Sequence, residues 1–235
     1  MKKDKAAYLA LYDREGNSLA EGEIHGQNGG YPIAIALSND AVKLAVSMIN
    51  INEGSVKSTI AFYNYGTVGQ NEIDHCVGVN NYDDMVIPEM EFTSNDRMVV
   101  FGDTKAVIFE GAQKPQAIAE IPMDEKTKSI FYNEHYIGIV TGNEDEAVTN
   151  HLAVYDENGK LVMEKDFGLD YSSIEFLTNN EICIRNANVC DIYTVHGVYK
   201  FHHEFEEELF EIIPGKLKLN YTLVLKDTTQ RIRLK

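Results

Sequence analysis

The amino-acid sequence predicts an all-β fold, a β-propeller-like array of four-stranded antiparallel blades that forms an incomplete or open propeller. Short runs of alternating apolar and polar residues, bounded by Gly, Asn and Asp, recur along the chain, whereas the 3.6-residue periodicity of helices is nearly absent. An aromatic strand recurs five times at intervals of about 40–50 residues, close to the period of propeller blades. A turn rich in Asn and Asp precedes four of these strands. Several elements therefore repeat in the same order.

The aromatic strand carries two small or apolar residues followed by Tyr or Phe, except that Asp191 takes the first place in the last copy. The aromatic residues are Tyr12, Tyr63, Phe109, Tyr155 and Tyr193. A glycine follows each of them closely, at Gly16, Gly66, Gly111, Gly159 and Gly197. We expect each copy to end in a tight hairpin in which the glycine takes a positive φ angle.

The turns that precede the aromatic strands contain Asn39-Asp40, Asn95-Asp96, Asn133-Glu134 and Asn179-Asn180. Each unit is thus strand, Asn/Asp turn, strand, loop, aromatic strand, glycine turn and strand. Within a single domain we expect complete units at 33–75, 87–122, 129–167 and 173–205, and partial units at 7–24 and 209–235. Because the chain opens in the middle of a unit, we expect it to be the C-terminal part of a longer propeller, with an exposed apolar face beside residues 7–24 that invites self-association.

Several strings of the sequence resemble an uncharacterised family of membrane-anchored, WD40/propeller-like proteins of Gram-positive bacteria, a family with a domain-of-unknown-function label. They include GYPIAIALSND at residues 30–40, AFYNYG at 61–66 and IRLK at 232–235. The resemblance implies a short cytoplasmic tail and one transmembrane helix upstream, followed by an extracytoplasmic propeller, and it implies no activity or ligand. This chain has no signal or transmembrane segment, so a cytoplasmic location is the alternative.

Charge and cysteine content exclude some classes of function. The chain has 37 acidic and 21 basic residues and a formal net charge of −16, which disfavours binding to phosphate backbones. We therefore expect no nucleic-acid partner, and no membrane contact by this segment itself. Cys76, Cys183 and Cys190 form no CxxC motif, and an odd number of thiols argues against a disulfide scaffold. We expect them to be small buried hydrophobic residues.

Three segments offer possible metal ligands. The segment 202–208 contains His202, His203 and four Glu residues, but adjacent side chains on a strand point to opposite faces and do not chelate together. The acidic segments 80–84 and 144–146 carry oxygen ligands that Ca²⁺ prefers, without a recognised ligand spacing. We interpret all three as exposed loops and predict no metal and no cofactor.

Glu91 and Glu175 are the candidate catalytic residues, because both fall in the first strand of a unit, the strand that lines the channel of a propeller. Converging carboxylates serve as acid and base in glycosidases. The equivalent residues of two other units are Ile35 and Ile130, so we favour a role in polar channel lining. No serine-hydrolase, zinc-protease or phosphate-loop motif occurs.

The sequence therefore favours a non-enzymatic binding or scaffolding module, with the loops at one end of the propeller as the contact surface. The expected partner is a protein or another component of the cell envelope. The alternatives are a carbohydrate-active enzyme that uses Glu91 and Glu175, and a purely structural cell-envelope domain. Fold alone does not decide among them.

Overall fold

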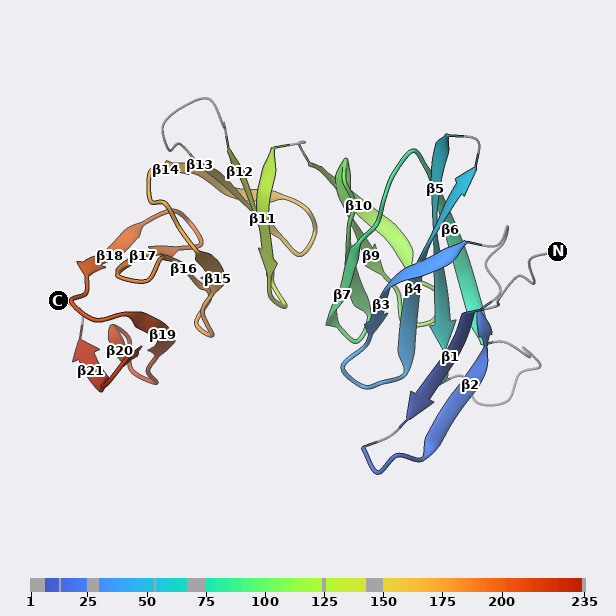
Figure 1. The fold of residues 1–235 in the computed structure, drawn as a ribbon, viewed down its shortest axis with the longest axis horizontal. Coiled ribbons are helices and arrows are strands. Elements are labelled where there is room, and N and C mark those ends of the chain that lie inside the picture. Colours follow the sequence, from blue (N-terminus) through green and yellow to red (C-terminus); the bar gives the residue numbers. More distant parts are fainter. Residues whose placement is uncertain are drawn as a thin grey trace. The chain divides into compact units, whose positions relative to one another are not determined.

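The computed structural model describes residues 7–12, 14–24, 30–52, 54–66, 75–123, 126–142 and 150–233. Every regular element in these ranges is a β-strand (Figure 1), and neighbouring strands of each sheet run antiparallel. The chain divides into two compact units, residues 1–125 and 126–235. No helix among the described residues is long and apolar enough to cross a bilayer.

The first unit contains one two-stranded and two four-stranded sheets. The two-stranded sheet consists of β1 (Ala7–Tyr12) and β2 (Ser18–Ile24). The next sheet consists of β3 (Tyr31–Leu37), β4 (Lys43–Asn52), β5 (Ser55–Asn64) and β6 (Cys76–Asp83). The third consists of β7 (Glu89–Ser94), β8 (Arg97–Phe101), β9 (Lys105–Glu110) and β10 (Gln116–Pro122).

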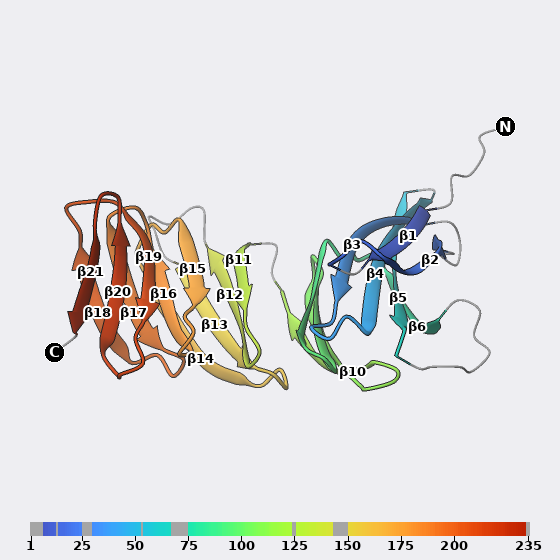
Figure 2. The same cartoon turned by 90° about the horizontal axis from the view of Figure 1, so that it is seen from below.

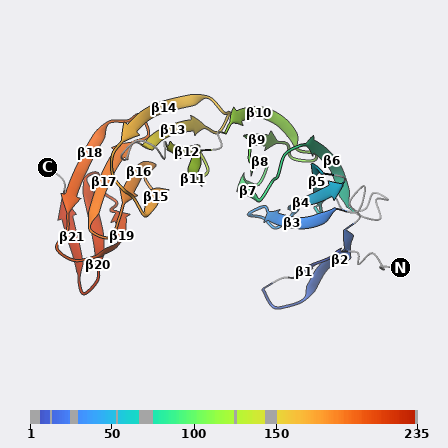
Figure 3. The same ribbon diagram turned by 45° about the horizontal axis from the view of Figure 1, so that its top comes forward.

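The second unit contains two four-stranded sheets and one of three strands. Its first sheet consists of β11 (Thr127–Tyr132), β12 (Tyr136–Gly142), β13 (Asn150–Asp156) and β14 (Leu161–Phe167). The second consists of β15 (Ser173–Phe176), β16 (Glu181–Arg185), β17 (Val189–Thr194) and β18 (Tyr199–Glu204), whose order is visible in Figure 3. The third consists of β19 (Leu209–Pro214), β20 (Asn220–Leu225) and β21 (Thr229–Arg233).

Within each unit neighbouring sheets pack face to face, as blades do. The first strands lie next to one another, β3 beside β7 and β11 beside β15, and Figure 2 shows β15–β18 stacked beside β19–β21. Between β3–β6 and β7–β10 the rings of Phe62 and Phe109 lie 5.2 Å apart in a buried apolar cluster. The fold is thus an all-β, propeller-like array of four-stranded antiparallel blades, as the sequence predicts.

The predicted repeat is confirmed by strand register. In the four complete sheets the aromatic residue of the third strand pairs with the second residue of the second strand. The pairs are Leu44 with Tyr63, Met98 with Phe109, Ile137 with Tyr155, and Ile182 with Tyr193. In the three-stranded sheet Ile232 pairs with Tyr221 and takes the aromatic position. Thus β21 is the third strand of its sheet.

The glycine turns follow the prediction except at Gly66. Gly159 and Gly197 have φ angles of 75° and 79°, and each donates its N–H to the carbonyl three residues earlier, Asp156 or Thr194, at 2.9 Å. Gly16 and Gly111 also have positive φ. At Gly66 the predicted positive φ is wrong, because this glycine is needed for close approach instead: a Cβ there would lie 2.4 Å from Cγ1 of Val42.

The Asn/Asp turns hold neighbouring sheets together. The N–H of Asp40 donates to the side chain of Asn95 in the next sheet at 3.1 Å. Lys43 reaches the same turn and bonds Asp96 at 2.6 Å. In the second unit the side chain of Asn133 donates to that of Asn180 at 2.8 Å. The turns therefore have a second role, in joining blades, that turn chemistry alone does not predict.

Sheet boundaries depart from the predicted units in one place. The first complete sheet runs from Tyr31 to Asp83 and so passes the predicted end at His75. Consequently, residues 80–83 of the acidic segment lie on strand β6 rather than in a loop. The acidic segment 144–146 lies outside the described residues. The expectation of a single domain stays a prediction.

Candidate partner-binding site

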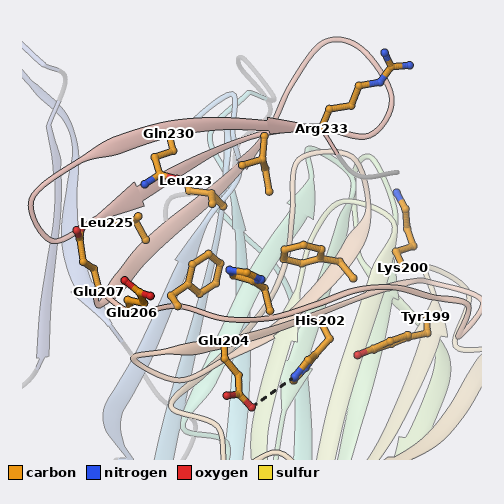
Figure 4. Close-up of a pocket in the computed structure, with 14 residues that line it drawn as sticks. Tyr199, Lys200, His202, Glu204, Glu206, Glu207, Leu223, Leu225, Gln230 and Arg233 are labelled. Atoms are coloured by element: carbon orange, nitrogen blue, oxygen red, sulfur yellow. Dashed lines mark ion pairs between the residues drawn. The ribbon is translucent and has the colours of Figure 1, made fainter.

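A groove of about 1150 Å³ lies in the second unit, between β18 on one side and β20 and β21 on the other (Figure 4). We call it the β18–β21 groove. It borders the apolar cluster that holds the two neighbouring sheets together, because Phe201, Phe205, Leu223, Leu225 and Ile232 belong to both. Its aromatic and apolar lining residues include Phe201, His203 and Phe205 from one sheet and Leu223, Leu225 and Ile232 from the other. Its polar lining residues include His202, Gln230 and Arg233.

An aromatic row forms one wall of the β18–β21 groove. Residues two apart on a strand share a face, which places Phe201, His203 and Phe205 together. The ring of His203 stacks on Phe201 at 5.9 Å and meets Phe205 edge-on at 4.6 Å. Leu223 and Leu225 of the opposite wall are buried, and Ile232 is half-buried. The apolar strip in each wall is therefore fixed by packing, while polar and charged side chains, among them Lys200, Glu204 and Arg233, line the rest of the groove.

The histidine segment differs from the sequence-based interpretation, because residues 202–204 lie on strand β18 and not in a loop. His202 and His203 have different partners, as the alternation of strand side chains predicts. His202 contacts Asp191 of the neighbouring strand at 2.7 Å. His203 instead contacts the rings of Phe201 and Phe205. Among the described residues no group of three or more His, Cys, Asp or Glu could hold a metal ion.

A buried polar network adjoins the end of the groove that Lys200 lines, which we call the inner end. Lys200 and Tyr221 both donate to the carboxylate of Glu181, and the Lys200 ammonium lies 3.1 Å from the Tyr221 hydroxyl. Burial, followed by the bond to Glu181, raises the pKa of Tyr221, so the phenol stays protonated. Since the charges of Lys200 and Glu181 compensate one another, Lys200 belongs to a structural network. Arg233 is an exposed cation at this end.

The outer end of the groove is acidic. Glu206 and Glu207 lie there, opposite Lys200 in Figure 4. The hydroxyl of Thr228, just before β21, lies 3.5 Å from Glu207. Thus β21 runs from the acidic outer end at Thr229 toward the inner end at Arg233.

Strand β21 is the edge of its sheet in the described part of the chain, where it pairs with β20 alone. The N–H of Leu225 donates to the carbonyl of Thr228 at 2.8 Å, which fixes the alternation of the ladder. Hydrogen-bonded and non-hydrogen-bonded pairs alternate in antiparallel strands. Therefore Thr229, Arg231 and Arg233 direct their N–H and C=O groups away from β20.

Glu91 and Glu175 lie in the first strands β7 and β15, one in each unit. Burial and the neighbouring Glu89 raise the pKa of Glu91. Glu175 Oε1 lies 3.6 Å from Nε of Arg185 in its own sheet. Neither residue lines the β18–β21 groove, and no observation on the described residues assigns either one a catalytic partner.

The cysteines follow the prediction in part. Cys183 and Cys190 are fully buried, with their sulfur atoms 3.6 Å apart in the sheet β15–β18. Cys76 is only half-buried, on β6. A hydrogen bond to Cys190 and burial raise the pKa of the Cys183 thiol. The two thiols are packed as hydrophobic residues.

A second exposed surface lies in the first unit. Tyr31, Ile33, Ile35 and Leu37 alternate along β3 and are all exposed, Tyr31 to 75% and Ile35 to 56%. We call this row the β3 stripe. On β1, Tyr8 and Tyr12 are exposed as well. The apolar face expected beside residues 7–24 stays a prediction.

The sequence did not identify the β18–β21 groove. Its one local signal is the alternation Phe201-x-His203-x-Phe205, which puts three rings on one face of a strand. The other wall comes from residues 223–232 and becomes visible only when the two sheets are packed. The free edge of β21 likewise depends on strand pairing and not on composition.

These sheets define a β-propeller-like protein with a groove between two of its blades. A family model described as "Family of unknown function (DUF5711)" matches residues 1–234, and the chain belongs to this family. No curated protein sequence matches the chain.

Solved structures with a similar arrangement are propellers of low sequence identity. The Pan2 WD40 domain of Neurospora crassa is 6% identical, with a TM-score of 0.47 over 96% of this chain and 69% of that one. The propeller domain of the Trilobed protease from Pyrococcus furiosus is 10% identical, with a TM-score of 0.47 over 86% and 70%. BBS1N, crystallised in complex with ARL6DN, is 13% identical, with a TM-score of 0.48 over 97% and 74%. Because these TM-scores are below 0.5, the fold rests on the sheets described above.

Proposed function

We propose that this protein is a non-enzymatic binding module that takes up a protein partner in the β18–β21 groove. The observation that carries this proposal is the combination of a fixed apolar strip in each wall, an aromatic row and an acidic end in one groove. Buried aromatic anchors with a polar rim are typical of protein-contact surfaces. The contact surface is thus a groove between outer strands, and not the end loops that the sequence favours.

The module works outside the cytoplasmic membrane, joined to it by a transmembrane segment upstream, and its partner is a component of the cell envelope. The support for this location is the resemblance of the sequence strings described above. Protease treatment of intact cells, followed by detection of a tag on this domain, tests it: an extracytoplasmic domain is digested, and a cytoplasmic domain is protected.

The groove is tested with a photo-crosslinking amino acid in the full-length protein in its native envelope. We expect a defined adduct from position 203 and none from position 151, an exposed histidine of β13 in the same unit that does not line the groove. The protein in the adduct is then purified and titrated against wild type, His203→Ala and His151→Ala. Loss of an aromatic-row contact of 1–2 kcal/mol weakens binding about tenfold. Equal binding by both variants would contradict the proposal.

A further inference from the structure

We propose that the partner adds an extended strand along the free edge of β21, antiparallel to it, with apolar side chains in the groove and acidic side chains beside Arg231 and Arg233. This rests on the function proposed above, since it states what kind of segment the β18–β21 groove takes. Its basis is the backbone edge, the groove face and the charge of β21.

The backbone edge is the first step. In each complete sheet the third strand, β5, β9, β13 or β17, is paired on both sides. The third-strand position of the last sheet belongs to β21, which pairs with β20 alone in the described chain. The outward groups of Thr229, Arg231 and Arg233 supply three donors and three acceptors at this edge. Such an edge is a template for strand addition.

The groove face decides which side chains of the added strand are apolar. Ile232 pairs with the buried Tyr221, and Gln230 with the buried Leu223, so both face the aromatic row of β18. In the complete sheets the fourth-strand residue opposite the aromatic position is Cys76, Ala117, Leu161 or Tyr199. None of these is charged. The added strand therefore places an apolar residue opposite Ile232.

Charge decides the other face. Arg231 and Arg233 are exposed and alternate with Gln230 and Ile232 along β21, Arg233 also lines one end of the groove, and β21 has no acidic residue. They form a basic pair on a chain with a net charge of −16. Opposite charges directly across a strand pair are stabilising. The added strand therefore places acidic residues opposite Arg231 and Arg233.

Direction follows from the antiparallel pairing. The added strand runs from Arg233 toward Thr229, and leaves the groove at the acidic end with Glu206 and Glu207. A basic residue suits that exit. The segment then reads acidic, apolar, acidic, followed by two uncharged residues and a basic one.

The test uses the purified chain and two fluorescent six-residue peptides, Glu-Val-Glu-Thr-Thr-Lys and its charge-reversed counterpart, measured by anisotropy. We expect the first peptide to bind and the second to bind at least tenfold more weakly. Arg231→Pro removes the outward N–H and is tolerated at an edge strand, so it weakens binding about tenfold or more beyond the matched variant Arg231→Ala. Arg231→Glu combined with Arg233→Glu reverses the peptide preference. Circular dichroism checks that each variant is folded.

The remaining outcomes separate this inference from the proposed function. If Arg231→Pro has no effect while His203→Ala abolishes binding, the groove binds a partner without strand addition, and only this inference is overturned. If neither peptide binds at millimolar concentration, this inference is also overturned. The same holds if light scattering shows a dimer of the chain that added peptide does not dissociate. If the partner crosslinked in the envelope binds Arg231→Pro and His203→Ala as tightly as wild type, the proposed function is overturned as well.

Discussion

Tyr221 in β20 donates a hydrogen bond to Glu181 in β16 and so joins the two sheets that form the groove. Glu181 is 8% exposed and Tyr221 is 2% exposed. A buried carboxylate is tolerated only when it is paired and hydrogen-bonded, and Lys200 supplies the opposite charge. The position of the groove walls therefore depends on this network.

Tyr221→Phe should lower the free energy of unfolding by about 1–3 kcal/mol, because Glu181 loses one of its two donors while the ring is kept. Urea denaturation followed by circular dichroism measures the change. Tyr199→Phe is the matched control, since its hydroxyl bonds Asp191 at an exposed site. An equal effect of the two variants would show that the network does not stabilise the sheets.

Tyr193 should make stability fall at alkaline pH. Burial, then the charges of Asp191 and Tyr199, raise the pKa of Tyr193 to about 12, whereas an unfolded tyrosine titrates near 10. The folded state thus holds a proton that the unfolded state loses, and stability declines as pH rises from 10 toward 12. Tyr193→Phe should reduce this decline, as seen in melting temperatures between pH 8 and 11. An unchanged slope would refute the assignment.

The glycine turns give a prediction about local backbone. Gly159→Ala and Gly197→Ala should each destabilise by about 1 kcal/mol, because a side chain disfavours positive φ. The loss should be larger at Gly197, where a Cβ would lie 3.0 Å from Cγ of Met163. Gly22→Ala is the control, since its φ is not positive and a Cβ there meets no atom within 4 Å. Thermal melting checks the order Gly197, Gly159, Gly22.

These glycines show what the sequence predicts well. An aromatic residue followed four positions later by Gly predicts a tight turn with a bulge in the strand. Tyr155 and Tyr193 have this bulge. Tyr63 has the bulge as well, but Gly66 follows it after three positions and does not take a positive φ. The glycine is set by contact with Val42, which lies far away in the sequence.

The candidate site was predicted less well for the same reason. The positions of Glu91 and Glu175 in first strands follow from the repeat, but whether a carboxylate has a catalytic partner depends on packing. The β18–β21 groove combines residues 199–207 with residues 223–233, and the free edge of β21 depends on pairing. Apart from the alternation of Phe201, His203 and Phe205, no local pattern indicates either feature.

Glu91→Gln tests how the raised pKa of Glu91, one of the two catalytic candidates, affects stability. Its pKa is raised, so the folded state binds a proton more tightly than the unfolded state, and stability falls as pH rises above about 4.5. The amide should therefore match or slightly exceed wild type in melting temperature at pH 7, and the difference should disappear near pH 4. Glu175→Gln is the comparison, since it loses a contact with Arg185. A clear loss of stability in Glu91→Gln at pH 7 would contradict this.

The β3 stripe should drive weak self-association of the isolated chain. Four large apolar side chains in one row, Tyr31, Ile33, Ile35 and Leu37, form the kind of exposed patch that marks a contact surface. Ile35→Lys places a charge in the middle of the row and should shift the mass in concentration-dependent light scattering toward the monomer. Ile118→Lys on β10 is the control, because Ile118 is exposed to a similar extent, 43% against 56%, outside this row. If wild type and both variants stay monomeric at millimolar concentration and bind an apolar dye equally, the stripe is not a contact surface of the isolated chain.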